Sequence, residues 1–149
     1  MSRLRLFCLL TFMFTGIAAN VAVAGDESKP WSQIDLGTIK QSDPRQYGLK
    51  LMAIDGRWDL TPESMYQVAS GVRRFIMATT KPRFRDKPTY AEFGLELQPC
   101  MNYQLVAVHP HGTHNREWMP TVTTARPIKR CMKKFGIAPS DAAIPTPTP

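Results

Sequence analysis

The feature that most constrains the fold is a regular alternation of apolar and polar residues in the second half of the chain. Phe93, Leu95 and Leu97 alternate with Glu92 and Glu96. Because successive side chains of a β-strand point to opposite faces, this run predicts a strand with one buried and one wet face. A second run over residues 103–108 is fairly apolar on both faces. It predicts a more central strand, which would pair with the first as a hairpin.

Further strands are predicted on both sides of this pair. Residues 47–53 form an alternating run that ends at Asp55-Gly56, a turn dipeptide whose aspartate we expect to hydrogen-bond its own backbone. Residues 118–125 are rich in β-branched side chains, and Pro127 follows them. The chain therefore has the strand content of a mainly β domain.

Residues 61–80 fit two different structures. Thr61, Pro62 and Glu63 have the order of an N-cap, a first helical residue and a first-turn acid. Five apolar residues then fall at helical spacing, namely Met65, Val68, Val72, Phe75 and Ile76. Against a helix, Gly71 would lie in its interior at a cost of about 1 kcal/mol relative to Ala. The alternative is a strand over 65–68, a turn, and a strand over 72–79, and the pattern alone leaves both open.

Two motifs follow one another in this part of the chain. They are Leu51-x-x-Ile54-Asp55-Gly56 and Tyr66-x-Val68-x-x-Gly71-x-Arg73. Their order resembles the layout of PEGA-type modules, which are small secreted or envelope β-sandwich domains. Ser70 stands where those modules usually have proline, and their second proline-rich motif is absent from the sequence. The resemblance implies an antiparallel β-sandwich and brings no catalytic residues with it.

We therefore predict a mainly β fold, an antiparallel β-sandwich of about six or seven strands over residues 47–136. The alternative is an α+β fold with a helix at 62–78. Residues 25–46 are polar and turn-rich, so we expect an extended N-terminal segment that could include an edge strand. Residues 137–149 combine several prolines with Ala and Thr, a composition that predicts a disordered tail.

The first 24 residues have the three parts of a secretory signal peptide. Arg3 and Arg5 form a basic start, an apolar run follows, and Ala22-Val23-Ala24 is a small-residue cleavage site. We expect the mature protein in the periplasm or outside the cell. Cleavage would lower the formal charge from +7 to +5, because it removes two arginines and no acidic residue.

Export also bears on the cysteines. Cleavage would leave Cys100 and Cys131, and an even pair in an oxidising compartment predicts a disulfide. In the chain-entropy model such a bridge stabilises the fold by roughly 3–4 kcal/mol. Paired cysteines are not nucleophiles, and the sequence has neither a Gly-x-Ser-x-Gly motif nor a glycine-rich phosphate loop. We therefore predict no catalytic residues.

All the histidines lie within six residues, at positions His109, His111 and His114, and Glu117 follows closely. Imidazole binds zinc and copper well, so this loop is a candidate metal site. The competing interpretation is a solvated loop that carries its histidines without a ligand. We expect no other cofactor.

The basic residues cluster in three stretches. The middle one spaces Lys81, Arg83, Arg85 and Lys87 two residues apart, so an extended chain would aim four positive charges to one side. This stretch is a candidate contact for an anionic envelope polymer or lipid surface, whereas export argues against nucleic acid. The other stretches are Arg73-Arg74 and the set Lys129, Arg130, Lys133 and Lys134.

These observations together predict an exported, non-enzymatic β-sandwich protein with a binding or structural role in the cell envelope. The alternative is a periplasmic zinc- or copper-binding protein that uses His109, His111 and His114.

Overall fold

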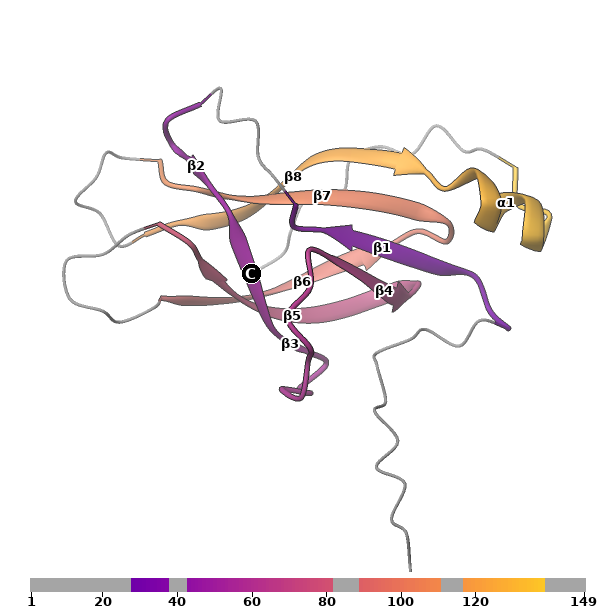
Figure 1. Ribbon diagram of the computed structural model, residues 1–149, viewed down its shortest axis with the longest axis horizontal. Coiled ribbons are helices and arrows are strands. Elements are labelled where there is room, and N and C mark those ends of the chain that lie inside the picture. Colours follow the sequence, from indigo (N-terminus) through magenta and orange to yellow (C-terminus); the bar gives the residue numbers. More distant parts are fainter. Residues whose placement is uncertain (1–27, 38–42, 82–88, 111–116, 139–149) are drawn as a thin grey trace, which may run out of the picture.

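The computed structural model describes residues 28–37, 43–81, 89–110 and 117–138. The predicted signal peptide at 1–24 and most of the predicted tail at 137–149 lie outside these ranges. The described residues form two packed β-sheets and one short helix (Figure 1). In chain order the elements are β1 (Trp31–Asp35), β2 (Gln46–Tyr47), β3 (Leu49–Ile54), β4 (Met65–Ala69), β5 (Gly71–Thr79), β6 (Tyr90–Leu97), β7 (Met101–Val108), β8 (Met119–Pro127) and α1 (Lys129–Phe135).

The larger sheet, which we call sheet A, is built around β7. On one side β8 pairs antiparallel along the whole of β7. On the other side β7 pairs with β1 in parallel and with the short β2 in antiparallel orientation. β1 pairs in turn with β4, antiparallel. The prediction that residues 103–108 form a central strand is therefore confirmed.

The smaller sheet, sheet B, has β5 between β3 and β6, with both pairs antiparallel. The main core lies between the two sheets and includes Ile34 and Tyr103 from sheet A. From sheet B, Phe75 and Phe93 stack with their ring centroids 5.6 Å apart. The predicted β-sandwich is confirmed, with eight strands among the described residues in place of the six or seven expected. One pair, β1 with β7, is parallel, whereas the prediction was an antiparallel sandwich.

Residues 65–79 form two strands, so the predicted helical alternative at 62–78 is wrong. The helical pattern counted Met65 and Val72 among its buried residues, but these side chains are 40% and 75% exposed. The strand alternative places them on outer faces. That alternative is confirmed, and the two strands belong to different sheets, β4 to sheet A and β5 to sheet B. The chain crosses between the sheets at Ser70 and Gly71, and Gly71 has a φ of 104° that favours glycine.

The predicted hairpin between residues 93–97 and 103–108 is also wrong. The alternation itself is confirmed, since Phe93, Leu95 and Leu97 are buried and Glu92 and Glu96 are exposed. However, β6 pairs with β5 in sheet B, whereas β7 lies in sheet A. Alternation specifies which face of a strand is buried, but it does not specify the neighbouring strand.

β1 comes from the segment at 25–46 that was predicted to be an extended lead-in with an edge strand. It lies between β4 and β7, so it is an interior strand of sheet A. Ile34 of this strand is fully buried in the main core. The folded domain therefore begins before residue 47.

The predicted turn at Asp55-Gly56 is present, with positive φ angles of 48° and 81°. We expected the Asp55 carboxylate to hydrogen-bond the backbone of its own turn, but its partners lie on β5. It accepts hydrogen bonds from the Arg74 backbone N–H at 2.9 Å and from the Arg73 guanidinium at 3.0 Å. Arg73 also donates to the carbonyls of Ala69 and Ser70, at 3.0 and 3.2 Å. This arginine therefore ties the crossover between the sheets to the β3 turn.

Candidate binding surface

α1 is a seven-residue helix that the sequence patterns did not predict. It begins soon after Pro127 and ends at Gly136, whose φ of 65° is left-handed and whose N–H donates to the Met132 carbonyl. Glycine adopts this conformation at little cost, so it terminates the helix. Seven residues are too few to show a clear helical period, and Ile128 provides no side-chain cap. The glycine is the signal in the sequence that could have marked the helix end.

A disulfide holds α1 on sheet A. The sulfur atoms of Cys100 and Cys131, predicted to pair, are 2.02 Å apart and join the residue before β7 to the helix. The Cys100 N–H also donates to the Trp31 carbonyl, and the Ile128 N–H donates to the Cys100 carbonyl, both at 2.8 Å. Trp31, the two cysteines and Met132 form a small second core. The helix is thus fixed in position relative to the sheet.

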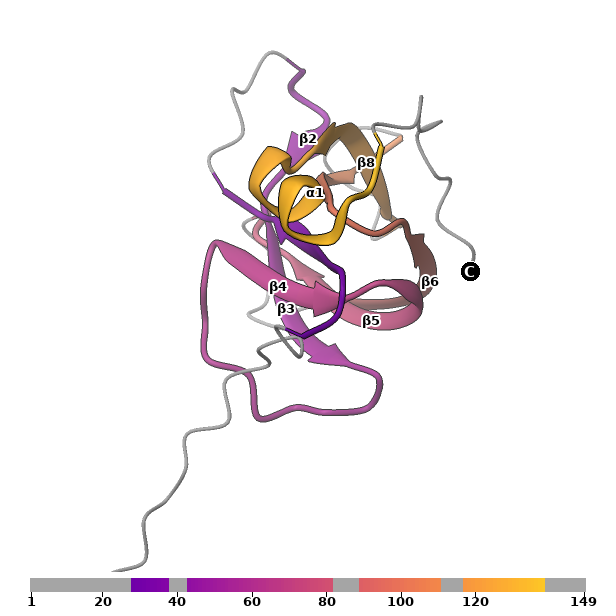
Figure 2. The ribbon, with the colours of Figure 1, turned by 90° about the vertical axis from the view of Figure 1, so that its right-hand side faces the viewer.

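Trp31 shows which face of sheet A the helix covers. Along β1, Ile34 points into the main core, so Trp31, three residues earlier, points to the outer face. Its side chain is nevertheless only 5% exposed, because it packs in the second core with residues of α1. Figure 2 looks onto this end of the molecule and shows α1 in front, beside β1.

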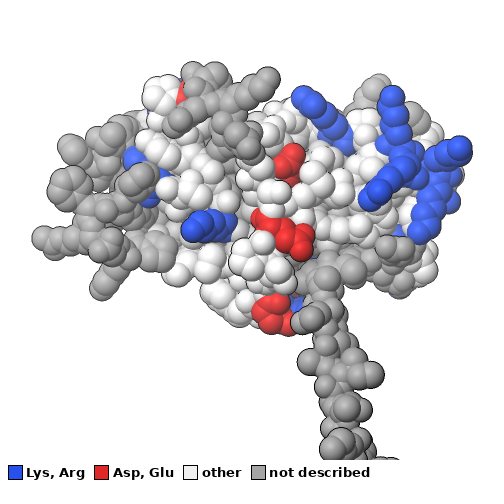
Figure 3. All heavy atoms as spheres, in the orientation of Figure 1, with Lys and Arg blue, Asp and Glu red and all other residues white. Residues whose placement is uncertain are grey.

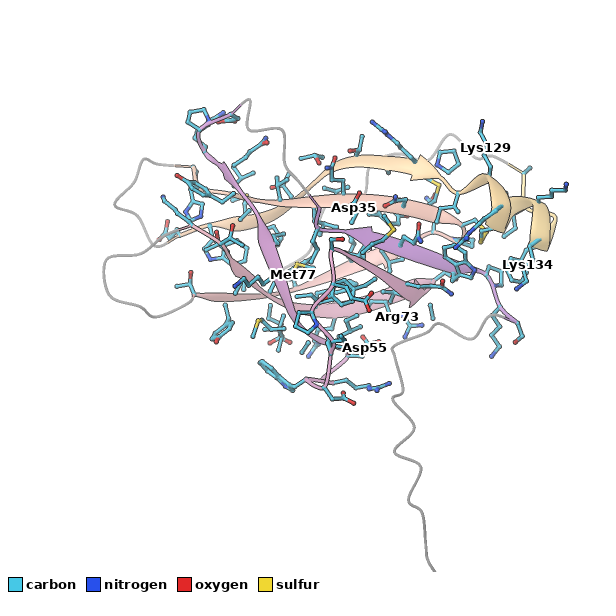
Figure 4. All side chains as sticks on the ribbon, in the orientation of Figure 1. Asp35, Asp55, Arg73, Met77, Lys129 and Lys134 are labelled. Carbon is cyan, nitrogen blue, oxygen red and sulfur yellow. A yellow bond between two sulfur atoms is a disulfide. The ribbon has the colours of Figure 1, made fainter. Side chains whose placement is uncertain are left out.

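Exposed cations cover the outer side of α1. We call this set the basic cap, and it consists of Arg126, Lys129, Arg130, Lys133 and Lys134. Figure 3 shows Lys and Arg gathered at this end of the molecule, and Figure 4 labels Lys129 and Lys134 on the helix. The Arg130 guanidinium lies over the Trp31 ring, 5.4 Å from its centroid. The sequence from 118 to 140 contains no Asp or Glu to offset this charge.

Ion pairs occur in other parts of the molecule. They join Arg45 to Asp43, Arg57 to Asp59, Arg73 to Asp55 and Arg74 to Glu92. The side-chain hydrogen bonds from Arg45 lower the pKa of Asp43, which keeps that carboxylate ionised beside its arginine. By contrast, Lys129, Arg130 and Lys133 form no ion pair with any residue that the structure describes.

Beyond α1, the outer face of sheet A carries a row of polar side chains. Residues paired directly across neighbouring strands point to the same side of a sheet. Gln33 on β1 pairs with Gln67 on β4 and with Asn102 on β7, and Asn102 pairs in turn with Arg126 on β8. The residues on either side of each amide are buried, so the amides face outward. The row thus crosses four strands and ends at the basic cap.

A second row lies two residues further along the strands. Asp35, labelled in Figure 4, pairs with Gln104, and Gln104 pairs with Thr124, whose hydroxyl donates to the Gln104 side-chain oxygen at 2.9 Å. The Oδ1 atom of Asn102 is buried and has no hydrogen-bond donor among the described residues. We call the set Gln33, Gln67, Asn102, Gln104 and Thr124 the polar platform.

His109, the first predicted metal ligand, follows the far end of β7 and is 2% exposed. Its ring meets Tyr47 edge-on at 5.1 Å between centroids and stacks with Trp118 at 6.5 Å. Its Nε2 atom lies 3.3 Å from the Thr79 hydroxyl. These contacts give His109 a packing role between the two sheets. In the part of the chain that the structure describes, no group of three or more His, Cys, Asp or Glu is placed to hold a metal ion.

Most residues of the two predicted binding loops lie outside the described ranges. These are His111, His114, Arg83, Arg85 and Lys87. Lys81 is described, and its Nζ atom lies 5.1 Å from the centroid of the Tyr47 ring. Of the predicted basic stretch and the predicted histidine set, the structure therefore describes only Lys81 and His109. It assembles the basic cap and the polar platform, of which only the cations of α1 were noted in the sequence.

Comparisons with protein-family models, with curated protein sequences and with solved structures find no match. The resemblance to PEGA-type modules therefore stays a prediction. Within the described ranges no helix is long and apolar enough to cross a membrane.

Proposed function

We propose that this protein is an exported, non-enzymatic module of the cell envelope that binds a polyanionic partner through the basic cap. The observation that carries the proposal is a group of exposed cations on a helix held by a disulfide. Lys129, Arg130 and Lys133 are exposed and form no ion pair with a described residue. Like charges grouped in this way attract a polyanion over a Debye length, about 8 Å at physiological salt.

The position of the cations along α1 adds to this argument. Lys133 and Lys134 lie in the last turn, where positive charge is favourable to the helix dipole. Stability alone can account for these two. Lys129 and Arg130 lie in the first turn, where no acidic residue offsets them and where the dipole disfavours positive charge. A polyanionic partner accounts for cations at both ends of the helix.

The attachment of α1 also suits a binding role. The disulfide and the second core hold the helix, so its backbone loses little freedom when a partner binds. The same bond supports export, because disulfides persist in oxidising compartments. The predicted signal peptide at 1–24 supports export independently.

We assign the contact with the polyanionic partner to α1 and not to the predicted stretch of Lys81, Arg83, Arg85 and Lys87. Lys81 packs against the Tyr47 ring, and the other three lie outside the described residues. Metal binding by the histidine loop has less support than the basic cap, because the contacts of His109 already explain its burial.

The test compares the purified, oxidised protein with a Lys129→Glu/Lys133→Glu double variant. Two anionic probes are titrated, the acidic polysaccharide alginate and vesicles of equal parts phosphatidylglycerol and phosphatidylcholine. The matched control is Lys50→Glu/Arg57→Glu, which makes the same charge change at exposed residues outside α1.

We expect the wild-type protein to bind at least one probe, and binding to weaken as salt is added. Because each cation near an anionic surface contributes about 1 kcal/mol, the cap variant should lose at least about tenfold in affinity. The control should lose much less. Equal losses in the two variants, or no binding of either probe by the wild type, would overturn the proposed function.

A further inference from the structure

The basic cap and the polar platform are neighbours on one face of the molecule. Arg126 of the basic cap links the two features, since it pairs across β7 and β8 with Asn102 of the platform and precedes Lys129 by only three residues. Trp31 connects them a second time, because it lies on the same face of β1 as Gln33 and packs beneath α1. The positively charged helix thus lies beside the platform on the same face of sheet A.

We propose that the partner of this face is an acidic polysaccharide, with its hydroxyl groups on the polar platform and its acidic groups at the basic cap. The inference rests on the proposed function and adds the chemical class of the ligand. Primary amides both donate and accept hydrogen bonds, and sugar hydroxyls do the same. A row of amides beside a row of cations therefore complements a chain that carries hydroxyls and acidic groups together.

The dimensions of the platform fit an extended chain. Neighbouring strands are about 4.8 Å apart, so the row from Gln67 on β4 to Arg126 on β8 extends for roughly 14 Å. Gln33 and Asn102 lie between these ends at the intermediate strand positions. A polymer lying along the row would meet an amide at each of three strands and a guanidinium at the fourth.

Asp35 favours a polysaccharide over a lipid surface. It lies on the platform beside Gln33 and accepts a hydrogen bond from the Gly37 N–H at 2.8 Å. Figure 3 shows acidic residues over the middle of this view and the cations at the end formed by α1. A plane of anionic headgroups spread over this face would be repelled at Asp35. A sugar hydroxyl can instead donate to that carboxylate.

The experiment measures binding of alginate, of the neutral polysaccharide dextran and of the phosphatidylglycerol vesicles. The platform variant is Gln33→Met/Gln67→Met, which keeps the side-chain size and removes two amides. Its control is Gln98→Met, which removes an exposed amide outside both rows. Unfolding by urea is followed for each variant to confirm that it is folded.

Loss of two neutral hydrogen-bonding groups should weaken alginate binding by roughly tenfold, whereas Gln98→Met should change it little. Vesicle binding, if the wild type shows any, should be the same in the platform variant. Dextran should bind more weakly than alginate because it has no acidic groups.

A second pair of variants gives effects of opposite sign, which a folding defect cannot produce. Gln33→Lys should tighten alginate binding and Gln33→Glu should weaken it, since each places a charge in the middle of the row. If Lys129→Glu/Lys133→Glu weakens alginate binding but the changes at Gln33 and Gln67 do not, the polysaccharide inference is wrong and the proposed function stands. Tighter binding of vesicles than of alginate would also overturn the inference, whereas failure of the cap variant as well would overturn both.

Discussion

β5 and α1 both carry adjacent cations, but the two sites use their charge differently. Arg73 of β5 is joined to Asp55, and Arg74 is joined to Glu92. On α1, Lys129 and Arg130 have no acidic partner among the described residues. The first pair forms ion pairs within the protein, and the second belongs to the surface that we propose as the polyanion contact. Two dipeptides that contribute the same charge in the sequence therefore differ in their contacts.

The difference follows from where each element lies. β5 is the central strand of sheet B, and its arginines reach Asp55 in the turn after β3 and Glu92 on β6. α1 instead follows the last strand and is attached to the sheet by Cys131. Since residues 118–140 contain no acid, the helix has no acidic residue of its own nearby in the sequence. The disulfide should thus matter for both stability and binding, whereas Arg73 should matter for stability alone.

The largest effect is expected from removing the disulfide. Cys100→Ser/Cys131→Ser should lower the free energy of unfolding by roughly 3–4 kcal/mol, because the unfolded chain loses its cross-link. Alginate binding should also weaken, since α1 would lose its main attachment to the sheet. Urea denaturation and alginate titration measure the two effects, with the wild type under reducing conditions as a control. A variant that binds alginate as tightly as the wild type would show that the fixed position of α1 is unnecessary.

His109 provides a third case, a titratable basic side chain enclosed by packing. His109→Ala should lower the free energy of unfolding by roughly 2–3 kcal/mol, because it leaves a cavity between Tyr47 and Trp118. The loss should be the same with and without stoichiometric zinc, and alginate binding should not change. Thermal unfolding with and without zinc provides the measurement. If zinc stabilises the wild type but not the variant, His109 is a metal ligand and its role is not packing alone.

Arg73→Ala tests whether the paired arginines of β5 contribute to stability and not to binding. It removes hydrogen bonds to Asp55, Ala69 and Ser70 and should lower the free energy of unfolding by about 1–2 kcal/mol, since the site is partly exposed. Arg73→Lys keeps the charge but cannot make all three contacts, so its loss should be smaller. Neither variant should change alginate binding. A loss of binding as large as that of the cap variant would show that charge anywhere on the molecule suffices.

The sequence predicted which face of each strand is buried better than it predicted which strands pair with one another. The burial of Phe93 and Tyr103 follows from local alternation, but their placement in different sheets depends on contacts between distant segments. The disulfide was predictable because only two cysteines, Cys100 and Cys131, lie outside the predicted signal peptide. The polar platform was not, since Gln33, Gln67 and Asn102 are far apart in the sequence and become neighbours only through strand register. α1 was missed because seven residues show no clear period.

The smallest expected effect separates helix stability from binding. Lys129→Glu places an acid in the first turn of α1, where the helix dipole favours it, and should stabilise the protein by about 0.3–0.5 kcal/mol. Lys133→Glu makes the same charge change in the last turn and should destabilise the protein by a similar amount. Both variants should nevertheless weaken alginate binding, by about fivefold or more. Urea denaturation at low salt and alginate titration distinguish the two properties.

Stability changes of the same sign in the two variants would show that the dipole is not what makes cations in the first turn unfavourable. Unchanged binding by Lys129→Glu would place the contact on Lys133 and its neighbours, where stability alone explains the charge.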